Sequence, residues 1–142
     1  MKLVFVCEKY KSKLVKACGI MEQVVSVSGF QTARCEIDEA GQDAKENIKA
    51  LSGADLLVIG TEPTGWDGVI SDNLKKFIAS CSHIEGRKVV VFSLKKLFGD
   101  KKALKNLMKA VEERGGFLFD FDIIAGEQDA KAFAERLKSA KK

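Results

Sequence analysis

The loop at residues 60–68 carries the side chains with the clearest potential for binding chemistry. It holds the chain's only proline, Pro63, its only tryptophan, Trp66, and three of the twelve glycines. The apolar run at 56–59, directly before it, predicts a buried strand. Because α/β proteins bind ligands in loops at the carboxyl ends of parallel strands, the Trp66 ring could stack on a flat ligand. Packing of Trp66 beneath its own loop explains the same residue equally well.

A second polar loop follows the expected first strand at residues 2–6, which is almost wholly apolar. Lys9, Lys11 and Lys13 alternate through this loop, and Ser12 stands where a helical pattern begins. Backbone amides at a helix N-terminus bind anions, so these lysines could join them in an anion site. Lysines are also common in an ordinary solvated loop, and the residues alone leave both interpretations open.

The elements that must position these loops alternate along the chain. Strands are expected at 2–6, 31–37, 55–59, 87–92 and 117–124. Helices are expected at 44–51 and 130–137, and where apolar residues recur at helical spacing from Leu14 to Val25, Leu74 to Cys81 and Leu104 to Val111. The expected N-caps are Ser12, Asp43, Ser71 or Asp72, and Asp100. Strands alternating with helices predict right-handed crossovers and a parallel sheet.

Residues 60–68, followed by the run Asn-Leu-Lys-Lys-Phe-Ile at 73–78, resemble the flavodoxin family, and the strand at 86–93 fits the same family. The resemblance covers essentially the whole chain. It implies one flavodoxin-like domain over 1–142, a doubly wound α/β sandwich whose five-stranded parallel sheet has the order 2-1-3-4-5 with helices on both faces. In that order, ligands bind where strands 1 and 3 diverge. The loops at 7–13, 60–70 and 93–101 would then share one rim of the sheet.

The resemblance implies a site for the cofactor FMN on this rim. In the family, the loop that matches Pro63, Thr64, Gly65 and Trp66 flanks the isoalloxazine ring, which gives Trp66 the role of stacking platform. Phe98 lies in the loop after the fourth strand and could cover the other face of the ring. Its alternative is an apolar contact that staples the start of the next helix in the core.

The FMN phosphate is held in this family by a Ser/Thr-x-Thr-Gly-x-Thr loop. Aligned without gaps, the six places are occupied here by Glu8, Lys9, Tyr10, Lys11, Ser12 and Lys13. Tyr10 and Lys11 replace a small hydroxyl and a glycine, which prevents close approach of the backbone. Glu8 would place a carboxylate near the phosphate, and one like-charge pair at ~4 Å costs about 4 kcal/mol at an effective dielectric near 20. The three lysines could offset that repulsion.

Two functions follow from these features. The first is an FMN-binding electron carrier or small flavin reductase, an oxidoreductase that would meet a redox partner protein. The alternative is a flavodoxin-like fold that has lost FMN and serves as a binding or regulatory module. A third option is an enzyme that acts on another phosphate-bearing ligand through the same lysines. The formal net charge of +4 departs from the acidic character typical of flavodoxins.

Composition and single residues disfavour other classes. A chain with 46% hydrophobic and 31% charged residues is typical of a soluble globular protein, and its apolar runs are too short to span a membrane. No basic motif is interleaved with aromatics, so nucleic-acid binding is not indicated. Because the N-terminus predicts a strand and not a signal peptide, a cytoplasmic location is expected.

The four cysteines are Cys7, Cys18, Cys35 and Cys81, which form no C-x-x-C, and His83 is the only histidine. A zinc site is therefore not expected, and the cysteines should be reduced thiols, buried at least at Cys18 and Cys35. Asp120 and Asp122 could form an acid–base pair, but a solvent-exposed face of the fifth strand is the simpler interpretation. No Ser-His-Asp arrangement or P-loop supports a hydrolase or a kinase.

Overall fold

The computed structural model describes residues 1–37, 51–63 and 67–141. Its strands are β1 (Lys2–Glu8), β2 (Gln31–Ile37), β3 (Leu56–Thr61), β4 (Lys88–Leu94) and β5 (Phe117–Ile124). They form one sheet in the order β2-β1-β3-β4-β5, and every neighbouring pair is parallel. The predicted fold class is confirmed.

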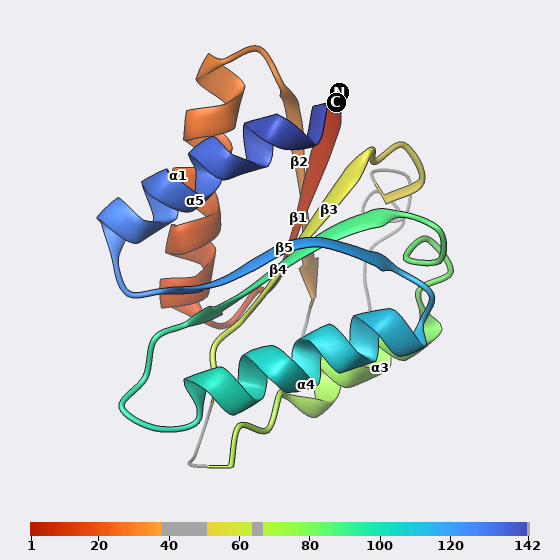
Figure 1. Cartoon of the computed structure of the whole chain (residues 1–142), viewed down its shortest axis with the longest axis vertical. Coiled ribbons are helices and arrows are strands. Elements are labelled where there is room, and N and C mark those ends of the chain that lie inside the picture. The colour runs from red at the N-terminus through yellow and green to blue at the C-terminus, as the bar shows by residue number, and fades with distance from the viewer. Residues whose placement is uncertain (38–50, 64–66, 142) are drawn as a thin grey trace.

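Helices cover both faces of this sheet (Figure 1). α1 (Ser12–Val27) and α5 (Glu127–Leu137) lie together on one face, and a 3-10 turn, η1 (Lys138–Lys141), follows α5. α3 (Asp72–Ser80) and α4 (Asp100–Glu113) lie on the other face. The helix expected at 44–51 and its cap Asp43 fall almost entirely outside the described residues. No helix in the described part of the chain is long and apolar enough to cross a membrane.

The central strands are apolar on both faces because each face is covered by helices. All six residues of β3 are buried. Along β1, Val4 and Val6 pack toward α3 and α4, whereas Leu3 and Phe5 pack toward α1 and α5. Two apolar cores thus form, one on each side of the sheet, and together they hold the strand ends and their loops in place.

The structure corrects two of the expected helix starts. Ser12 is the first residue of α1 and not its cap, since the N-cap is Lys11 and makes no capping hydrogen bond through its side chain. Asp100 is the first residue of α4, where the N-cap is Gly99 with a φ of 85°. This left-handed conformation favours glycine, so backbone geometry decides the start of α4. Ser71 caps α3 as expected, with its Oγ accepting the Leu74 N–H at 3.2 Å.

Candidate functional site

Buried polar side chains gather at the carboxyl rim of the sheet. Within the described residues, Glu8, Thr61 and Ser93 are the polar or charged side chains that are buried, and each is fully buried. Glu8 ends β1, Thr61 ends β3 and Ser93 is the last residue but one of β4. Because burial of polar groups is costly unless they are paired, three such groups on adjacent strands mark this rim as the candidate site.

A network of five residues, here called the Glu8 network, surrounds the buried carboxylate. Its members are Glu8, Tyr10, Lys11, Ser71 and Asn73. Glu8 Oε2 accepts hydrogen bonds from Ser71 Oγ at 2.7 Å and from the Tyr10 hydroxyl. Lys11 Nζ lies 3.7 Å from Glu8 Oε1, and Asn73 Nδ2 donates to the Tyr10 oxygen at 3.0 Å. The network therefore links the start of α1 to the start of α3.

Lys11 reaches across the point where β1 and β3 diverge. Its ammonium donates to the carbonyl oxygen of Glu62 at 2.7 Å, while the Glu62 carboxylate pairs with Lys96 Nζ at 2.9 Å. The side chain of Lys11 is only 13% exposed, because it lies along this rim. Lys9, Ser12 and Lys13, by contrast, are exposed. The structure thus divides the six residues of the expected phosphate loop into two sets, one engaged with Glu8 and one facing solvent.

This arrangement does not fit an FMN phosphate held in the manner of the family loop. The Ser71 and Tyr10 hydroxyls and the Lys11 ammonium are the donors that an incoming anion would need, and the Glu8 carboxylate already engages them. In the described part of the chain, Glu8 Oε1 and Thr61 Oγ1 are the buried side-chain atoms without a hydrogen-bond partner. The Glu8 carboxylate, whose Oε1 has only the Lys11 ammonium at 3.7 Å beside it, would repel a phosphate, as expected for a like-charge pair.

The same network shifts the pKa of the Tyr10 phenol. Burial raises the pKa of Tyr10, and the hydrogen bond to Glu8 raises it further. The hydrogen bond from Asn73 acts in the opposite direction and lowers it. Tyr10 is nevertheless 44% exposed, because its ring faces solvent while its hydroxyl points into the network. At neutral pH the phenol is protonated, and its O–H donates a hydrogen bond to Glu8.

The ring side of the expected site is only partly described. Pro63 is buried, whereas Thr64, Gly65 and Trp66 lie outside the described residues, so their expected role stays a prediction. Phe98 is 51% exposed, and the interpretation that it packs in the core is wrong. Its neighbour Leu97 is 89% exposed, a feature that the sequence analysis missed. The β4–α4 loop therefore presents two adjacent apolar side chains to solvent.

Sequence reasoning also missed several members of the site. Ser71 was expected only as a helix cap, and Glu62, Asn73 and Lys96 carried no expectation. Glu62 and Asn73 lie within or beside the loop after β3, and Lys96 lies in the loop after β4. The sequence could have indicated these residues, because polar residues in or beside the loops at the carboxyl rim are candidate site residues once the strand order is known.

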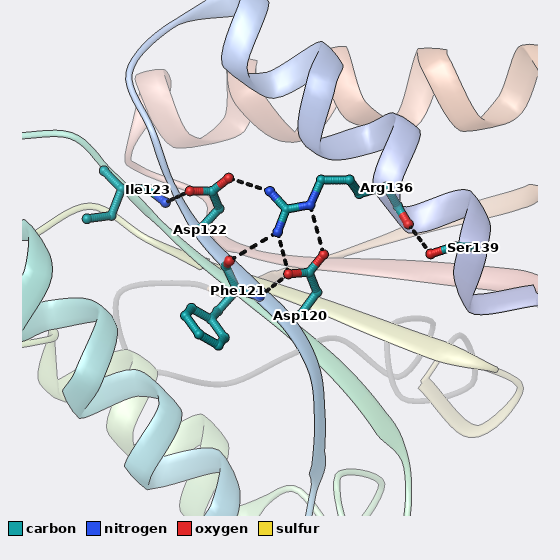
Figure 2. A network of polar contacts seen from close by, with 6 residues as sticks. All are labelled: Asp120, Phe121, Asp122, Ile123, Arg136 and Ser139. Carbon is teal, nitrogen blue, oxygen red and sulfur yellow. Dashed lines mark hydrogen bonds and ion pairs between the residues drawn. The ribbon is translucent and has the colours of Figure 1, made fainter.

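Asp120 and Asp122 both pair with one arginine (Figure 2). Arg136 of α5 donates to Asp120 Oδ2 from Nε at 3.0 Å and to Asp122 Oδ2 from Nη1 at 2.5 Å. The hydrogen bond to Asp120 is the largest influence raising the pKa of Arg136. The Asp120 and Asp122 side chains are 22% and 43% exposed, so the carboxylate face is partly open to solvent, and Arg136 of α5 covers the rest.

The aromatic residues of β5 occupy alternate, exposed positions of the strand. A β-bulge between Leu118 and Asp120 shifts the register against β4. Phe117, Phe119 and Phe121 are 65%, 41% and 50% exposed, and the Phe121 ring lies on the far side of the strand from Arg136 (Figure 2). Exposed and half-buried residues therefore alternate from Phe117 to Asp122 as expected, despite the bulge.

The four cysteines are free thiols, and all are buried. Burial of Cys18 and Cys35 was predicted and is confirmed. Cys7 on β1 and Cys18 on α1 lie close enough to interact, and the hydrogen bond between them, with burial, raises the pKa of Cys18 well above its usual range. No group of three or more His, Cys, Asp or Glu residues in the described ranges is arranged to hold a metal ion.

Solved structures with the same architecture match the chain over its whole length. A WrbA-like flavodoxin from Agrobacterium tumefaciens matches with a TM-score of 0.71 at 17% identity, over 99% of this chain and 96% of that one. A flavodoxin from the domain Archaea matches with a TM-score of 0.73 at 13% identity, over 100% of both chains. The chain has a flavodoxin-like fold.

The two-electron reduced flavodoxin of Megasphaera elsdenii is a further match, with a TM-score of 0.67 at 14% identity over 99% of both chains. No protein-family model and no curated protein matches the sequence. At such low identities the matches establish the flavodoxin-like fold, and the function has to be argued from the site itself.

Proposed function

We propose that this flavodoxin-like chain is a binding or regulatory module that does not hold FMN. The observation that carries the proposal is the fully buried Glu8 carboxylate, which Ser71, Tyr10 and Lys11 surround at the phosphate end of the expected cofactor site. An anion supplied by the chain itself takes the place in which the family binds the anion of its cofactor. A fold shared with flavodoxins is compatible with this function, because one scaffold hosts many.

The energetic argument depends on burial. Around the exposed loop residues Lys9 and Lys13, solvent screens a charge and makes an additional anion tolerable. Around Glu8 the exposed fraction is zero, so a phosphate would meet a carboxylate with little solvent between them. A phosphate that displaced Glu8 would also break its contacts with the Ser71 hydroxyl and the Lys11 ammonium, and both groups would need new partners. Both effects act against FMN.

The second candidate function is an FMN-binding electron-transfer protein, an oxidoreductase that would work with a redox partner. Two observations favour it: the full-length match to flavodoxin structures, and the exposed Leu97 and Phe98 on the loop that would flank the isoalloxazine ring. Affinity would then come mainly from ring stacking, with Trp66 as the expected platform. Riboflavin, which lacks the phosphate, would lose little affinity relative to FMN.

Titration of FMN into the purified protein, followed by quenching of flavin fluorescence, separates the two functions. The proposed module gives no saturable quenching by the unaltered chain. The double variant Glu8→Thr with Lys11→Gly restores part of the family loop and should bind FMN more tightly than riboflavin. A control with the same change of charge on α4, Lys105→Gln with Glu112→Gln, should behave like the unaltered chain. Yellow protein on purification, or quenching by the unaltered chain, would overturn the proposal in favour of the flavin function.

A further inference from the structure

A cavity of about 310 Å³ lies on the α1 and α5 face of the sheet, beside the carboxyl ends of β4 and β5. One wall comes from a single face of α1, since Lys13, Lys16, Ala17 and Ile20 are spaced three or four residues apart. The other walls come from the end of β4, the end of β5 and the start of α5. Figure 1 shows the β5–α5 connection turning back beside α1 to close this corner of the molecule.

The charged lining of the cavity is mostly unpaired. Among the residues that the structure describes, no carboxylate lies within ion-pair distance of Lys13, Lys16 or Lys95. Lys96 also lines the cavity but pairs with Glu62. Three lysine ammonium groups around one cavity create a positive electrostatic potential, which attracts an anion.

One carboxylate, that of Glu127, also lines the cavity. Its Oε1 pairs with Lys131 Nζ at 3.4 Å, one turn further along α5, so it is partly neutralised. Gly126 precedes it as the N-cap of α5, and a side chain built there would meet open space.

The floor of the cavity is apolar. It is formed by the buried side chains of Ala17, Leu94, Ile124 and Ala130, with the half-buried Ile20 at its side. A hollow that combines an apolar floor with lysines suits a molecule with a short apolar body and a compact anion. Its volume lies at the lower end of the range for ligand cavities, roughly 300–1,000 Å³, which favours one small molecule over a dinucleotide or a polymer.

We infer that this cavity binds a small organic phosphate ester, with Lys13, Lys16 and Lys95 around the phosphate and the floor of Ala17, Leu94, Ile124 and Ala130 against the organic part. The site is separate from the Glu8 network and does not depend on the proposed function. If the chain is a module without FMN, this cavity would still let it bind a ligand, because the Glu8 carboxylate occupies only the expected position of the cofactor phosphate.

Phenyl phosphate is the probe for the test, with phenol and inorganic phosphate as its two halves. Binding is measured by calorimetry and by shifts of backbone amide signals in NMR spectra. Phenyl phosphate should bind saturably at about millimolar concentration and shift Ala125 and Gly126, and both halves should bind more weakly. The triple variant Lys13→Gln, Lys16→Gln and Lys95→Gln should weaken binding by about tenfold or more and reduce its dependence on salt.

A control with the same loss of charge on the opposite face is Lys76→Gln, Lys101→Gln and Lys105→Gln, and it should bind phenyl phosphate like the unaltered chain. Ala125→Phe, at an exposed position that lines the cavity, should fill part of the cavity without altering the core. Equal weakening by both triple variants would overturn the inference, because it would indicate attraction to net charge alone. Tighter binding of an oligonucleotide or a phosphoserine peptide would likewise replace the small-molecule assignment.

Shifts at Tyr10 and Ser71 in place of Ala125 and Gly126 would place the anion at the Glu8 network. That result would contradict both this inference and the proposed function. Binding at Ala125 and Gly126 together with FMN quenching would overturn the proposed function alone, so the two failures are distinguishable.

Discussion

At the scale of single residues, Glu8 is the fully buried charge at the rim of the sheet on which the proposed function rests. A carboxylate with no exposed surface is stable only where donors surround it, and here the donors come from Tyr10, Ser71 and Lys11. These residues come from the β1–α1 loop and from the start of α3. With a small hydroxyl residue at position 8 the Ser71 hydroxyl would be available to an anion, although Tyr10 and Lys11 would still limit approach of the backbone.

Tyr10 is the chain's only tyrosine, which makes its titration directly measurable. Burial and the hydrogen bond to Glu8 raise its pKa, so its ionisation should occur above its ordinary value of about 10. Because the pKa is higher in the folded state, its contribution to stability is fully present below about pH 10 and is lost as the pH rises through the folded value. Absorbance at the tyrosinate band across an alkaline pH series gives this measurement.

Glu8→Gln provides the comparison for that titration. Loss of the negative charge and of the charged acceptor should lower the pKa of Tyr10, while burial keeps it above the ordinary value. Glu85→Gln, an exposed position on the opposite rim, should leave the titration unchanged. An unchanged Tyr10 titration in Glu8→Gln would show that the Glu8 network does not form in solution.

At the scale of elements, β5 shows how an edge strand is kept from pairing with another chain. The Phe121 and Ile123 amides donate to the Asp120 and Asp122 carboxylates at 2.8 Å, and Arg136 Nη2 donates to the Phe121 carbonyl oxygen at 3.4 Å. These backbone groups would otherwise be open to a further strand. The exposed phenylalanines of β5 make such protection necessary, because an apolar edge with free amides favours aggregation.

Arg136→Ala should test this role of the edge. It removes the partner of Asp120 and Asp122 and uncovers the Phe121 carbonyl oxygen, so we expect a loss of about 1 kcal/mol in the free energy of unfolding. We also expect dimers or larger species at high protein concentration. Urea denaturation gives the first quantity and size-exclusion chromatography the second.

Lys131→Ala is the matched control for that variant. It removes an exposed cation from the same helix, where Lys131 pairs with Glu127 at 3.4 Å, so it should cost only about 0.3 kcal/mol and cause no association. A purely monomeric Arg136→Ala protein would mean that the carboxylates alone protect the edge.

At the scale of the whole molecule, the two cores make the thiols report on global unfolding. Cys7, Cys18 and Cys35 lie on β1, α1 and β2, Cys81 is the C-cap of α3, and all four are buried. The raised pKa of Cys18 further reduces its thiolate fraction at neutral pH. An alkylating reagent should therefore label the native protein slowly at all four positions, with Cys18 least reactive.

Unfolding without a reducing agent should release four reactive thiols, counted by mass after alkylation. A Cys7→Ser variant removes the thiol that hydrogen-bonds to Cys18, and three labels are then expected from the unfolded chain. Only two reactive groups in the unfolded, unaltered protein would reveal a disulfide and contradict the free thiols of the structure.

The sequence by itself determined the elements and, with the family resemblance, their order. Apolar runs bounded by turn residues were sufficient for β1, β3 and β4, because strands covered on both faces need no alternation. Ser71 was recognisable as a cap from local chemistry alone. The composition of the loop after β1 was also sufficient to show that the chain departs from the family's phosphate loop.

Only the tertiary structure decided which side chains meet. Glu8 and Ser71 are 63 residues apart in the sequence, as are Tyr10 and Asn73, and no local pattern links them. The approach of α5 decided that Asp120 and Asp122 both meet Arg136. The physical reason is the same in each case: hydrogen bonding and burial of a side chain depend on neighbours that the packing of distant elements supplies, whereas helix and strand patterns are set by residues close in sequence.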